Sequence, residues 1–397
     1  MWEPTAKRAR ATAMHRFMQE TGHDDYDALY QWSVSNSPAF WESLCEFCEV
    51  RFDRPANSIL TRPDNIMNAG WFAGSQLNYA AHLLRYDGDE AALILVGEDG
   101  TRRELSRDAL RTQVAAVAAG LRAAGVRKGD RVGGFLPNCP EAVIAMLATT
   151  SLGAIWSSCS PDFGVNGVVD RFGQIEPKVL FAVNGYFYNG KTCDTRSTIE
   201  GVVSAVGSIE KTVVIRFVND LGADIAIRNA IDWQDFAVAG QPLSFTTVDF
   251  DHPLYIMYSS GTTGAPKCIV HGHGGTLLQH LKEHVLHTDI SGNDRVFYFT
   301  TCGWMMWNWL VSGLATGATL VLFDGSPFFN DGRVLWQMAE QEEVTVFGTS
   351  AKYISALEKA GVRPKEEFSL PRLRAVLSTG SPLAPESFDY VYDAIGD

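Results

Sequence analysis

The sequence predicts an α/β protein built from stacked, mostly parallel sheets flanked by helices. From residue 91 onward, short apolar strand-like runs alternate with helical stretches, a pattern typical of parallel sheets covered by helices. The 397 residues are too many for one compact core and indicate two or three domains or subdomains. With 46% hydrophobic and 20% charged residues, the composition is that of a globular protein.

Two parts follow one another along the chain. Residues 1 to about 70 are rich in Trp, Phe and charged side chains and are predicted to be helical, for example over 39–50. The pattern changes at residue 91, where strands over 91–96 and 101–105 flank the turn Glu98-Asp99-Gly100 and predict a hairpin. We therefore expect a mainly helical amino-terminal segment over 1–90 and a large α/β domain over 91–397.

A helix is predicted directly after this hairpin. Ser106 is a suitable N-cap, Asp108 places a negative charge in the first turn, and Gly125 is a suitable end. The apolar face of this helix carries Leu110, Val114, Val117 and Leu121, which follow one another at 4-3-4 spacing.

The remaining elements alternate. Strands are predicted over 131–136, 154–158, 178–183, 212–217, 254–258, 319–323, 344–348 and 374–378, with helices at 140–150, 276–287 and 332–341. The most apolar stretch, 142–159, is interrupted by Thr149-Thr150-Ser151 and Ser157-Ser158. We therefore expect a buried helix that runs into a buried strand, not a membrane span.

Charge and cysteine usage exclude several classes of protein. The net charge of −13 argues against a nucleic-acid surface and means that an anionic ligand must be held by local donors. The first twenty residues contain no apolar stretch typical of a secretory signal. The seven cysteines, an odd number, favour reduced thiols, so a cytoplasmic protein is expected, with no membrane and no protein partner indicated.

The strongest functional signal is the segment 258–267, which reads Tyr-Ser-Ser-Gly-Thr-Thr-Gly-Ala-Pro-Lys after an apolar strand. Such a loop can direct backbone N–H groups, hydroxyl groups and an ammonium group toward one polyanion. Its glycines permit the positive φ angles that wrapping a phosphate requires. An ordinary surface loop is the alternative. The predicted phosphate-binding residues are Ser259, Ser260, Gly261, Thr262, Thr263, Gly264 and Lys267.

Three other patterns compete with this interpretation. Residues 185–192 fit the P-loop pattern G-x-x-x-x-G-K-T, but three aromatic residues at the x positions would crowd a phosphate, so a turn carrying Lys191 is favoured over a P-loop kinase. His280 and His284 match a zinc-protease pattern without an evident third ligand. Cys45 and Cys48 form a single C-x-x-C pair and are expected in the core.

The loop 258–267 resembles the signature phosphate loop of the adenylate-forming superfamily, which includes acyl-CoA synthetases, luciferases and peptide-synthetase adenylation domains. Residues 71–79 resemble the amino-terminal cap of its acetyl-CoA synthetase branch, and the segments 103–106, 129–132 and 136–141 resemble the superfamily's first motifs. The segments 153–164, 301–309 and 378–383 are closer to the acetoacetate–CoA ligases of this branch than to its acetyl-CoA synthetases. The resemblance extends from about residue 30 to the end.

The resemblance implies a fold and a reaction. The fold is the large adenylation domain of acyl-CoA synthetases. The reaction activates a carboxylic acid with ATP as an acyl-adenylate, releases pyrophosphate, and transfers the acyl group to coenzyme A. It implies that Ser259 to Thr263 and Lys267 hold the β- and γ-phosphates, and that Thr262 lies near Mg²⁺. Thr262 and Lys267 are then the catalytic residues, and Gly380, Ser381 and Pro382 lie along the adenine ring.

The resemblance also implies an acid pocket and coenzyme A contacts. Trp304, Met305, Met306 and Trp307 correspond to the pocket wall, and their bulk favours a small acid, for which the resemblance implies acetoacetate. A buried aromatic helix start is the alternative for any one of them. Phe163, Gly164 and Lys191 lie in segments that correspond to the coenzyme A region.

The sequence departs from this superfamily at its end. The segments that carry the Mg²⁺-binding glutamate, the ribose-binding aspartate, the hinge and the small carboxy-terminal domain are not found in the 397 residues. We therefore expect an incomplete large domain that catalyses no acid-dependent exchange of pyrophosphate into ATP by itself. A non-catalytic nucleotide-binding protein and a ligase for another small acid remain the alternatives.

Overall fold

The amino-terminal segment combines helices with short strands. In the computed structural model, residues 3–221, 227–259 and 264–396 are described. The segment contains α1 (Ala6–Ala11), α2 (Ala13–Glu20), α3 (Tyr26–Ser35), α4 (Ser37–Phe47), β1 (Ser58–Thr61), β2 (Gly70–Ala73), β3 (Gln76–Leu77) and α5 (Tyr79–Leu83). The helical prediction is therefore right as far as residue 47 and wrong over 58–73, where β1 and β2 pair antiparallel. Prolines at 55 and 63 flank β1 and disfavour a continuous helix there.

The larger of two main sheets has seven strands. Their order is β12 (Ala230–Asp232), β11 (Lys211–Ile215), β8 (Val179–Val183), β6 (Arg131–Phe135), β7 (Ile155–Cys159), β14 (Pro253–Ser259) and β15 (Lys267–Gly272). Every neighbouring pair is parallel except β14 and β15, which are antiparallel. The edge strand β15 was not predicted, because its six residues follow the predicted loop without a separating turn.

The second main sheet has six strands. Their order is β19 (Ala375–Thr379), β18 (Val346–Ser350), β16 (Arg295–Tyr298), β17 (Thr319–Asp324), β4 (Ala91–Gly97) and β5 (Arg102–Ser106). The predicted hairpin supplies β4 and β5, and β4 continues the parallel part of this sheet by pairing with β17. The eight strands predicted from residue 131 onward are all present within two residues at either end, and the mostly parallel α/β class is confirmed.

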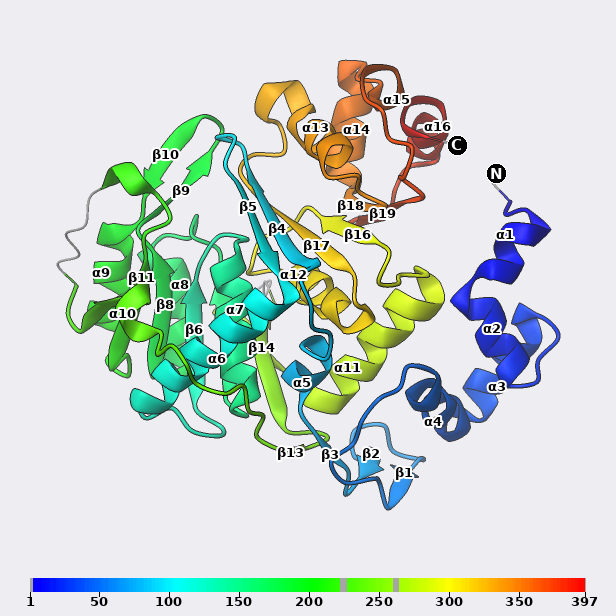
Figure 1. Cartoon of the computed structure of the whole chain (residues 1–397), viewed down its shortest axis with the longest axis horizontal. Coiled ribbons are helices and arrows are strands. Elements are labelled where there is room, and N and C mark those ends of the chain that lie inside the picture. Colours follow the sequence, from blue (N-terminus) through cyan, green and yellow to red (C-terminus); the bar gives the residue numbers. More distant parts are fainter. Residues whose placement is uncertain (1–2, 222–226, 260–263, 397) are drawn as a thin grey trace.

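Helices form the layers between and outside the two sheets (Figure 1). They are α6 (Arg107–Ala123), α7 (Pro140–Ser151), α8 (Val165–Ile175), α9 (Arg196–Ala205), α10 (Trp233–Phe236), α11 (His273–Leu281), α12 (Met305–Ser312), α13 (Val334–Gln341), α14 (Ala351–Ala360), α15 (Pro364–Glu367) and α16 (Pro385–Tyr390). Short 3₁₀ segments lie at Asn219–Leu221, Gly313–Thr316 and Phe329–Gly332, and π-helical turns at Lys282–His287 and Val391–Ile395. Two further short pairs are β3 with β13 (Val248–Asp249) and β9 (Gly185–Tyr188) with β10 (Lys191–Asp194).

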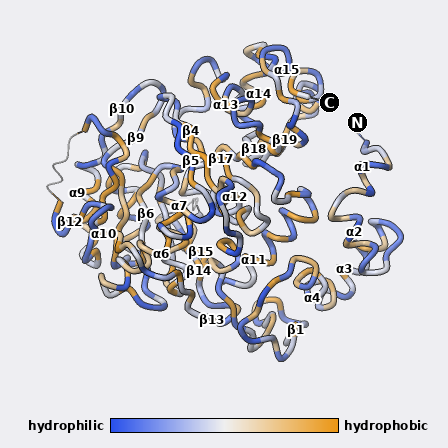
Figure 2. The backbone as a smooth tube through the Cα atoms, in the orientation of Figure 1, coloured by the Kyte–Doolittle hydropathy of each residue, from blue (hydrophilic) through white to orange (hydrophobic). Residues whose placement is uncertain are grey.

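The central layer contains α7, which contacts β6 and β7 of one sheet and β4 of the other. All its residues except Glu141 are buried, so the apolar stretch predicted as a buried helix and strand is confirmed in α7 and β7. Helices α8 and α9 cover the outer face of the seven-stranded sheet, and α13 and α14 cover that of the six-stranded sheet. Figure 2 shows apolar residues along the central strands, as expected for strands that are covered by helices on both faces.

The predicted helix after the hairpin is confirmed in detail. The Ser106 side chain accepts a hydrogen bond from the Ala109 N–H at 3.2 Å, and α6 buries the four predicted apolar residues of its face. Gly125 follows the helix with φ at +77°. Among the described residues, no helix is both long enough and apolar enough to cross a lipid bilayer.

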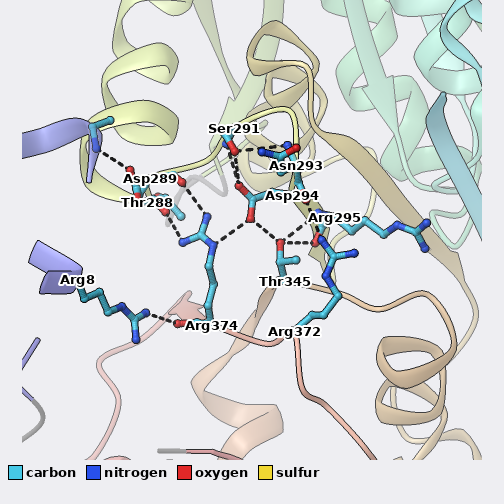
Figure 3. A network of polar contacts seen from close by, with 11 residues as sticks. Arg8, Thr288, Asp289, Ser291, Asn293, Asp294, Arg295, Thr345, Arg372 and Arg374 are labelled. Carbon is cyan, nitrogen blue, oxygen red and sulfur yellow. Dashed lines mark hydrogen bonds and ion pairs between the residues drawn. The ribbon is translucent and has the colours of Figure 1, made fainter. Parts of the chain in front are cut away.

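An ion pair between the half-buried Arg374 and the buried Asp294 fixes the start of β19 (Figure 3). The Arg374 guanidinium donates to Asp294 Oδ1 at 2.9 Å and to the carbonyl oxygens of Thr288 and Asp289 at 3.0 and 2.9 Å. Asp294 Oδ1 also accepts a hydrogen bond from the Thr345 hydroxyl at 2.8 Å. These contacts join β19 to the turn before β16 and to the chain just before β18.

The amino-terminal helices attach at the same place. Arg8 donates to the Arg374 carbonyl oxygen at 3.1 Å, and the Ala13 N–H at the start of α2 donates to Asp289 Oδ1 at 2.7 Å. The first helices therefore lie beside β19, and Figure 1 shows the two chain ends close together. The division into a segment over 1–90 and a domain over 91–397 stays a prediction.

Candidate functional site

The predicted site segments all follow the carboxyl ends of parallel strands. Ser259 ends β14, Phe163 follows β7, Trp304 follows β16, and Gly380 follows β19. In open α/β sheets, ligands bind outside this edge, because the loops there are free to vary while the strands hold them in place. Ser259 and Phe163 follow strands of the seven-stranded sheet, and Trp304 and Gly380 follow strands of the six-stranded sheet.

The phosphate segment begins and ends on two adjacent strands. Ser259 of β14 and Lys267 of β15 are directly opposite each other in the antiparallel register, and the Lys267 side chain is exposed. Gly264 has φ at +97°, which confirms the predicted use of a glycine there. An exposed ammonium group opposite a hydroxyl group, beside a left-handed glycine, fits a polyanion such as a triphosphate.

Four residues predicted in this segment, Ser260, Gly261, Thr262 and Thr263, lie outside the described residues. The Mg²⁺ assignment rests on Thr262 and therefore stays a prediction. Among the residues that are described, no three His, Cys, Asp or Glu side chains gather at one point.

The acid-pocket segment crosses the carboxyl ends of the other sheet. The Ser158 hydroxyl of β7 donates to the Cys302 carbonyl oxygen at 2.7 Å, which fixes the chain after β16 against β7. A Cβ atom at Gly303 would lie 3.8 Å from the Phe163 ring, so the predicted acid and coenzyme A segments are neighbours. The next side chain, Trp304, is 66% exposed at this junction.

The four predicted wall residues divide into two groups. Trp304, Met305 and Met306 are exposed or half-buried at the start of α12. Trp307, in contrast, is completely buried, and its Nε1–H donates to Asn138 Oδ1 at 3.0 Å. Since a side chain without exposed surface contacts no ligand in this conformation, we correct Trp307 to a core position that supports the wall.

The segment that resembles a P-loop is a β-hairpin. Strands β9 and β10 enclose Asn189 and Gly190, which have φ at +51° and +73°, a two-residue turn with both angles positive. Glu98 occupies the N–H groups of this turn: its carboxylate accepts from Asn189 N at 2.9 Å and from Gly190 N at 2.7 Å. A carboxylate thus already fills the position that a phosphate would take, and the P-loop alternative is wrong.

A second carboxyl group holds the same hairpin. Asp324 is at the end of β17, and its Oδ2 accepts a hydrogen bond from the Phe187 N–H, with 3.4 Å between Oδ2 and the nitrogen. Burial raises the pKa of Asp324 to about 7; the Phe187 N–H opposes that rise and the neighbouring Glu98 adds to it. The hairpin is therefore fixed across the carboxyl edge of the six-stranded sheet, with Lys191 exposed just beyond its turn.

The two remaining alternatives are structural. Burial lowers the pKa of His280 and His284 to about 3, and His284 Nε2 lies 2.8 Å from Ser312 Oγ within the core. Cys45 and Cys48 are buried, and burial raises the pKa of each thiol to about 12. The two histidines are therefore core residues, and the expected core position of the cysteines is confirmed.

The predicted adenine segment follows β19, the edge strand of the six-stranded sheet. Gly380, Ser381 and Pro382 are exposed at the end of β19. Ser381 and Pro382 line a groove of about 1040 Å³ that Arg8 and His15 of the amino-terminal helices also line. Within the described ranges, no hydrogen bond joins these three residues to the phosphate, acid or coenzyme A segments.

Three contact residues were not predicted from the sequence. Glu98 was predicted to lie in a turn. The only sequence signal for a contact role is its position directly after a strand. Arg171 and Gln174 of α8 contact Tyr258, Phe163 and the phosphate segment, and no local pattern distinguishes them from an exposed helix face.

Comparisons with known proteins agree with this arrangement. A family model described as AMP-binding enzyme matches residues 81–397, and one described as acetyl-coenzyme A synthetase N-terminus matches residues 26–83. The acetoacetyl-coenzyme A synthetase of Rhizobium meliloti (strain 1021) is 48% identical over 404 residues, covering 100% of this chain and 62% of that protein. A malonamoyl-CoA synthetase of Penicillium aethiopicum is 40% identical over 431 residues, with 100% and 59% covered.

A solved structure is similar over the same range. The acetoacetyl-CoA synthetase from Streptomyces lividans superimposes with a TM-score of 0.93 at 44% identity, covering 99% of this chain and 62% of that protein. The chain therefore spans about three fifths of the length of the relatives it matches.

Proposed function

We propose, because this chain belongs to the AMP-binding enzyme family, that it provides the nucleotide- and acid-binding part of an ATP-dependent ligase that joins a small carboxylic acid to coenzyme A. The observation that carries the proposal is the common location of three segments. Ser259 and Phe163, from the predicted phosphate and coenzyme A segments, lie at the carboxyl edge of the seven-stranded sheet. The chain before Trp304, in the predicted acid wall, is fixed to that edge by the hydrogen bond from Ser158 to Cys302.

The chemistry of such a ligase matches what this edge offers. A carboxylate is already ionised at neutral pH, so its attack on a phosphate needs no general base. The site has to align the two anions and to neutralise charge on the leaving pyrophosphate. Lys267, Ser259 and the backbone beside Gly264 supply donors for the second task, in a protein whose net charge of −13 offers no general attraction.

Acetoacetate is the acid we propose. Relatives named acetoacetyl-CoA synthetase are 43% to 48% identical to this chain. The bulk of the half-buried Met305 and Met306 beside Trp304 favours a short acid over a long acyl chain. The relative named malonamoyl-CoA synthetase favours a second candidate, the amide of malonic acid, which also carries a carbonyl group at its third carbon.

The remaining substrates and the location follow from the same proposal. ATP and coenzyme A are the co-substrates, and Mg²⁺ accompanies the triphosphate. Seven unpaired cysteines support a reducing compartment such as the cytoplasm. The negative charge gives no support to a nucleic-acid partner.

An acid screen tests the proposed substrate. The reading frame that encodes this chain, expressed from start codon to stop codon, is supplied with ATP, Mg²⁺, coenzyme A and one acid at a time. We expect kcat/KM for acetoacetate to exceed that for acetate by about tenfold or more, because each recognised group is worth about that much in a pocket of fixed size. Acetate or a long-chain acid as the best substrate contradicts the choice of acid, and malonamate as the best substrate selects the second candidate.

A further inference from the structure

Arg171 lies between the phosphate segment and the coenzyme A segment. It belongs to α8, which begins after Gly164 and thus continues directly from the predicted coenzyme A residues. One turn later on the same helix, Gln174 donates from Nε2 to the Pro266 carbonyl oxygen at 2.8 Å. Residues three apart share a helix face, so Arg171 faces the same surroundings as Gln174, next to the segment that ends at Lys267.

Two aromatic rings hold the Arg171 guanidinium in place. Its central carbon lies 4.5 Å from the centre of the Phe163 ring and 5.6 Å from the centre of the Tyr258 ring. Tyr258 is itself fixed, because its hydroxyl oxygen lies 3.0 Å from Ser157 Oγ. A cation stacked on two anchored rings loses little further freedom when it binds a ligand.

Most of the hydrogen-bonding capacity of this guanidinium is unused. Arg171 Nη1 donates to the Gly167 carbonyl oxygen at 2.6 Å, which is the one hydrogen bond that the described part of the chain gives this side chain. None of the ion pairs within residues 3–221, 227–259 and 264–396 includes Arg171. A guanidinium has five N–H donors in a planar fork that fits the oxygens of a phosphate.

Arg171 is half-buried and has no carboxylate partner in the described part of the chain, although the protein has a net charge of −13. Several other arginines of this chain do have a carboxylate partner, as Arg103 has Glu141 and Arg333 has Glu367. Because Arg171 lies beside two segments that we assign to phosphate-bearing substrates, a phosphate is within reach of a guanidinium that no carboxylate occupies.

We propose that Arg171 binds a phosphate group of a substrate, through the free edge of its guanidinium. The proposal rests on the proposed function, since that function places phosphates on both sides of the residue. The chemistry recognised is a phosphate dianion or a diphosphate, and its source is either the triphosphate of ATP or the phosphates of coenzyme A.

Binding measurements on the whole chain test the proposal. ATP and coenzyme A are titrated separately by calorimetry into the parent protein, Arg171→Met and Arg127→Met. Arg127 is an exposed arginine just before β6, at the opposite edge of the sheet, so its replacement removes the same charge at a distance. We expect Arg171→Met to weaken one of the two ligands by about tenfold and Arg127→Met to leave both unchanged, because charge-assisted hydrogen bonds act at contact distance.

A second variant separates phosphate binding from packing. Arg171→Lys keeps the charge but loses the planar fork, and it should recover part of the lost affinity and the salt dependence that Arg171→Met loses. A side chain that only supports Phe163 and Tyr258 would leave the salt dependence of binding unchanged. Melting temperatures of all variants show whether each one is folded.

The pattern of affinity losses identifies the ligand that Arg171 binds. Weaker ATP binding alone identifies the triphosphate as the source, and weaker coenzyme A binding alone identifies coenzyme A. Unchanged binding of both ligands to Arg171→Met, or an equal loss in Arg127→Met, overturns the proposal. A parent protein that binds neither ligand contradicts the proposed function itself. Inorganic tripolyphosphate then tests Arg171 alone, and equal binding to parent and Arg171→Met overturns it.

Discussion

Replacing Lys267 by methionine is expected to weaken ATP binding by about tenfold to a hundredfold, because a charge-assisted hydrogen bond to phosphate contributes about 1.5–3 kcal/mol. The Lys267 ammonium group is exposed opposite Ser259, at the carboxyl edge where a triphosphate fits. Methionine keeps the length of the side chain and removes the charge. Because Lys267 is exposed, the melting temperature should stay close to that of the parent protein.

Lys191 provides the matched control. It is also an exposed lysine that follows a glycine-containing turn, but Glu98 already occupies the N–H groups of that turn. Lys191→Met should therefore leave ATP affinity within about twofold of the parent value. Both affinities are measured by equilibrium dialysis with labelled ATP. If Lys191→Met weakened ATP binding and Lys267→Met did not, the assignment of the phosphate segment would be wrong.

Replacing Arg374 by methionine is expected to destabilise the protein by about 3–5 kcal/mol, because removing one partner leaves the other as an unpaired buried charge. The side chain of Asp294 is only 8% exposed, and Arg374 donates to it at 2.9 Å. The same substitution also leaves the carbonyl oxygens of Thr288 and Asp289 without the arginine donor. We expect a melting temperature several degrees below that of the parent protein.

The neighbouring Arg372 is the matched control. Its guanidinium lies 3.4 Å from Glu343, and both side chains are largely exposed, 43% and 56%. Exposed ion pairs contribute about 0–1 kcal/mol, so Arg372→Met should change stability little. Equal losses of stability in Arg372→Met and Arg374→Met would contradict the stabilising role of the ion pair between Arg374 and Asp294.

The effect of Arg374→Met should depend on pH. Burial by itself would raise the pKa of Asp294, but hydrogen bonds from Arg374, Ser291 and Thr345 hold that pKa below its usual range. A carboxyl group whose pKa is lowered by folding contributes stability above its unfolded pKa, and this stability is lost as pH falls through the folded pKa. The difference in melting temperature between parent and Arg374→Met should therefore be large at about pH 7 and shrink below about pH 4. A difference independent of pH would contradict this cause.

The elements that the sequence predicts well are those fixed by neighbouring residues. The hairpin over 91–105 and the helix that Ser106 caps depend on a turn, a cap and a spacing within one segment. The location of Ser259 at the end of a strand follows from the apolar run before it. Each of these required only local information.

Pairing between distant strands could not be predicted in the same way. The strand β4 pairs with β17 rather than with β6, the next strand after its hairpin, and the four-residue β16 is too short to show a period. In the middle of β15, Ile269 and Val270 are apolar and yet exposed, so their sequence does not distinguish a sheet edge from a loop.

The same limit applies to the site. Arg374 and Asp294 are 80 residues apart, and Glu98 and Gly190 are 92 residues apart, so the fold alone brings them together. The aromatic residues at 304–307 predicted a wall, but only the packing of α12 shows that Trp307 turns into the core. The long-range polar contacts are therefore the part of the structure that the sequence does not predict.

The central claim is that the segment between Ser259 and Lys267 binds the triphosphate of ATP. A crystal structure of this chain with a non-hydrolysable ATP analogue tests it most directly. The account predicts phosphate oxygens within hydrogen-bonding distance of Ser259 Oγ or Lys267 Nζ. A triphosphate bound instead at the hairpin over 185–194, with the segment over 259–267 making no contact to it, would contradict the claim.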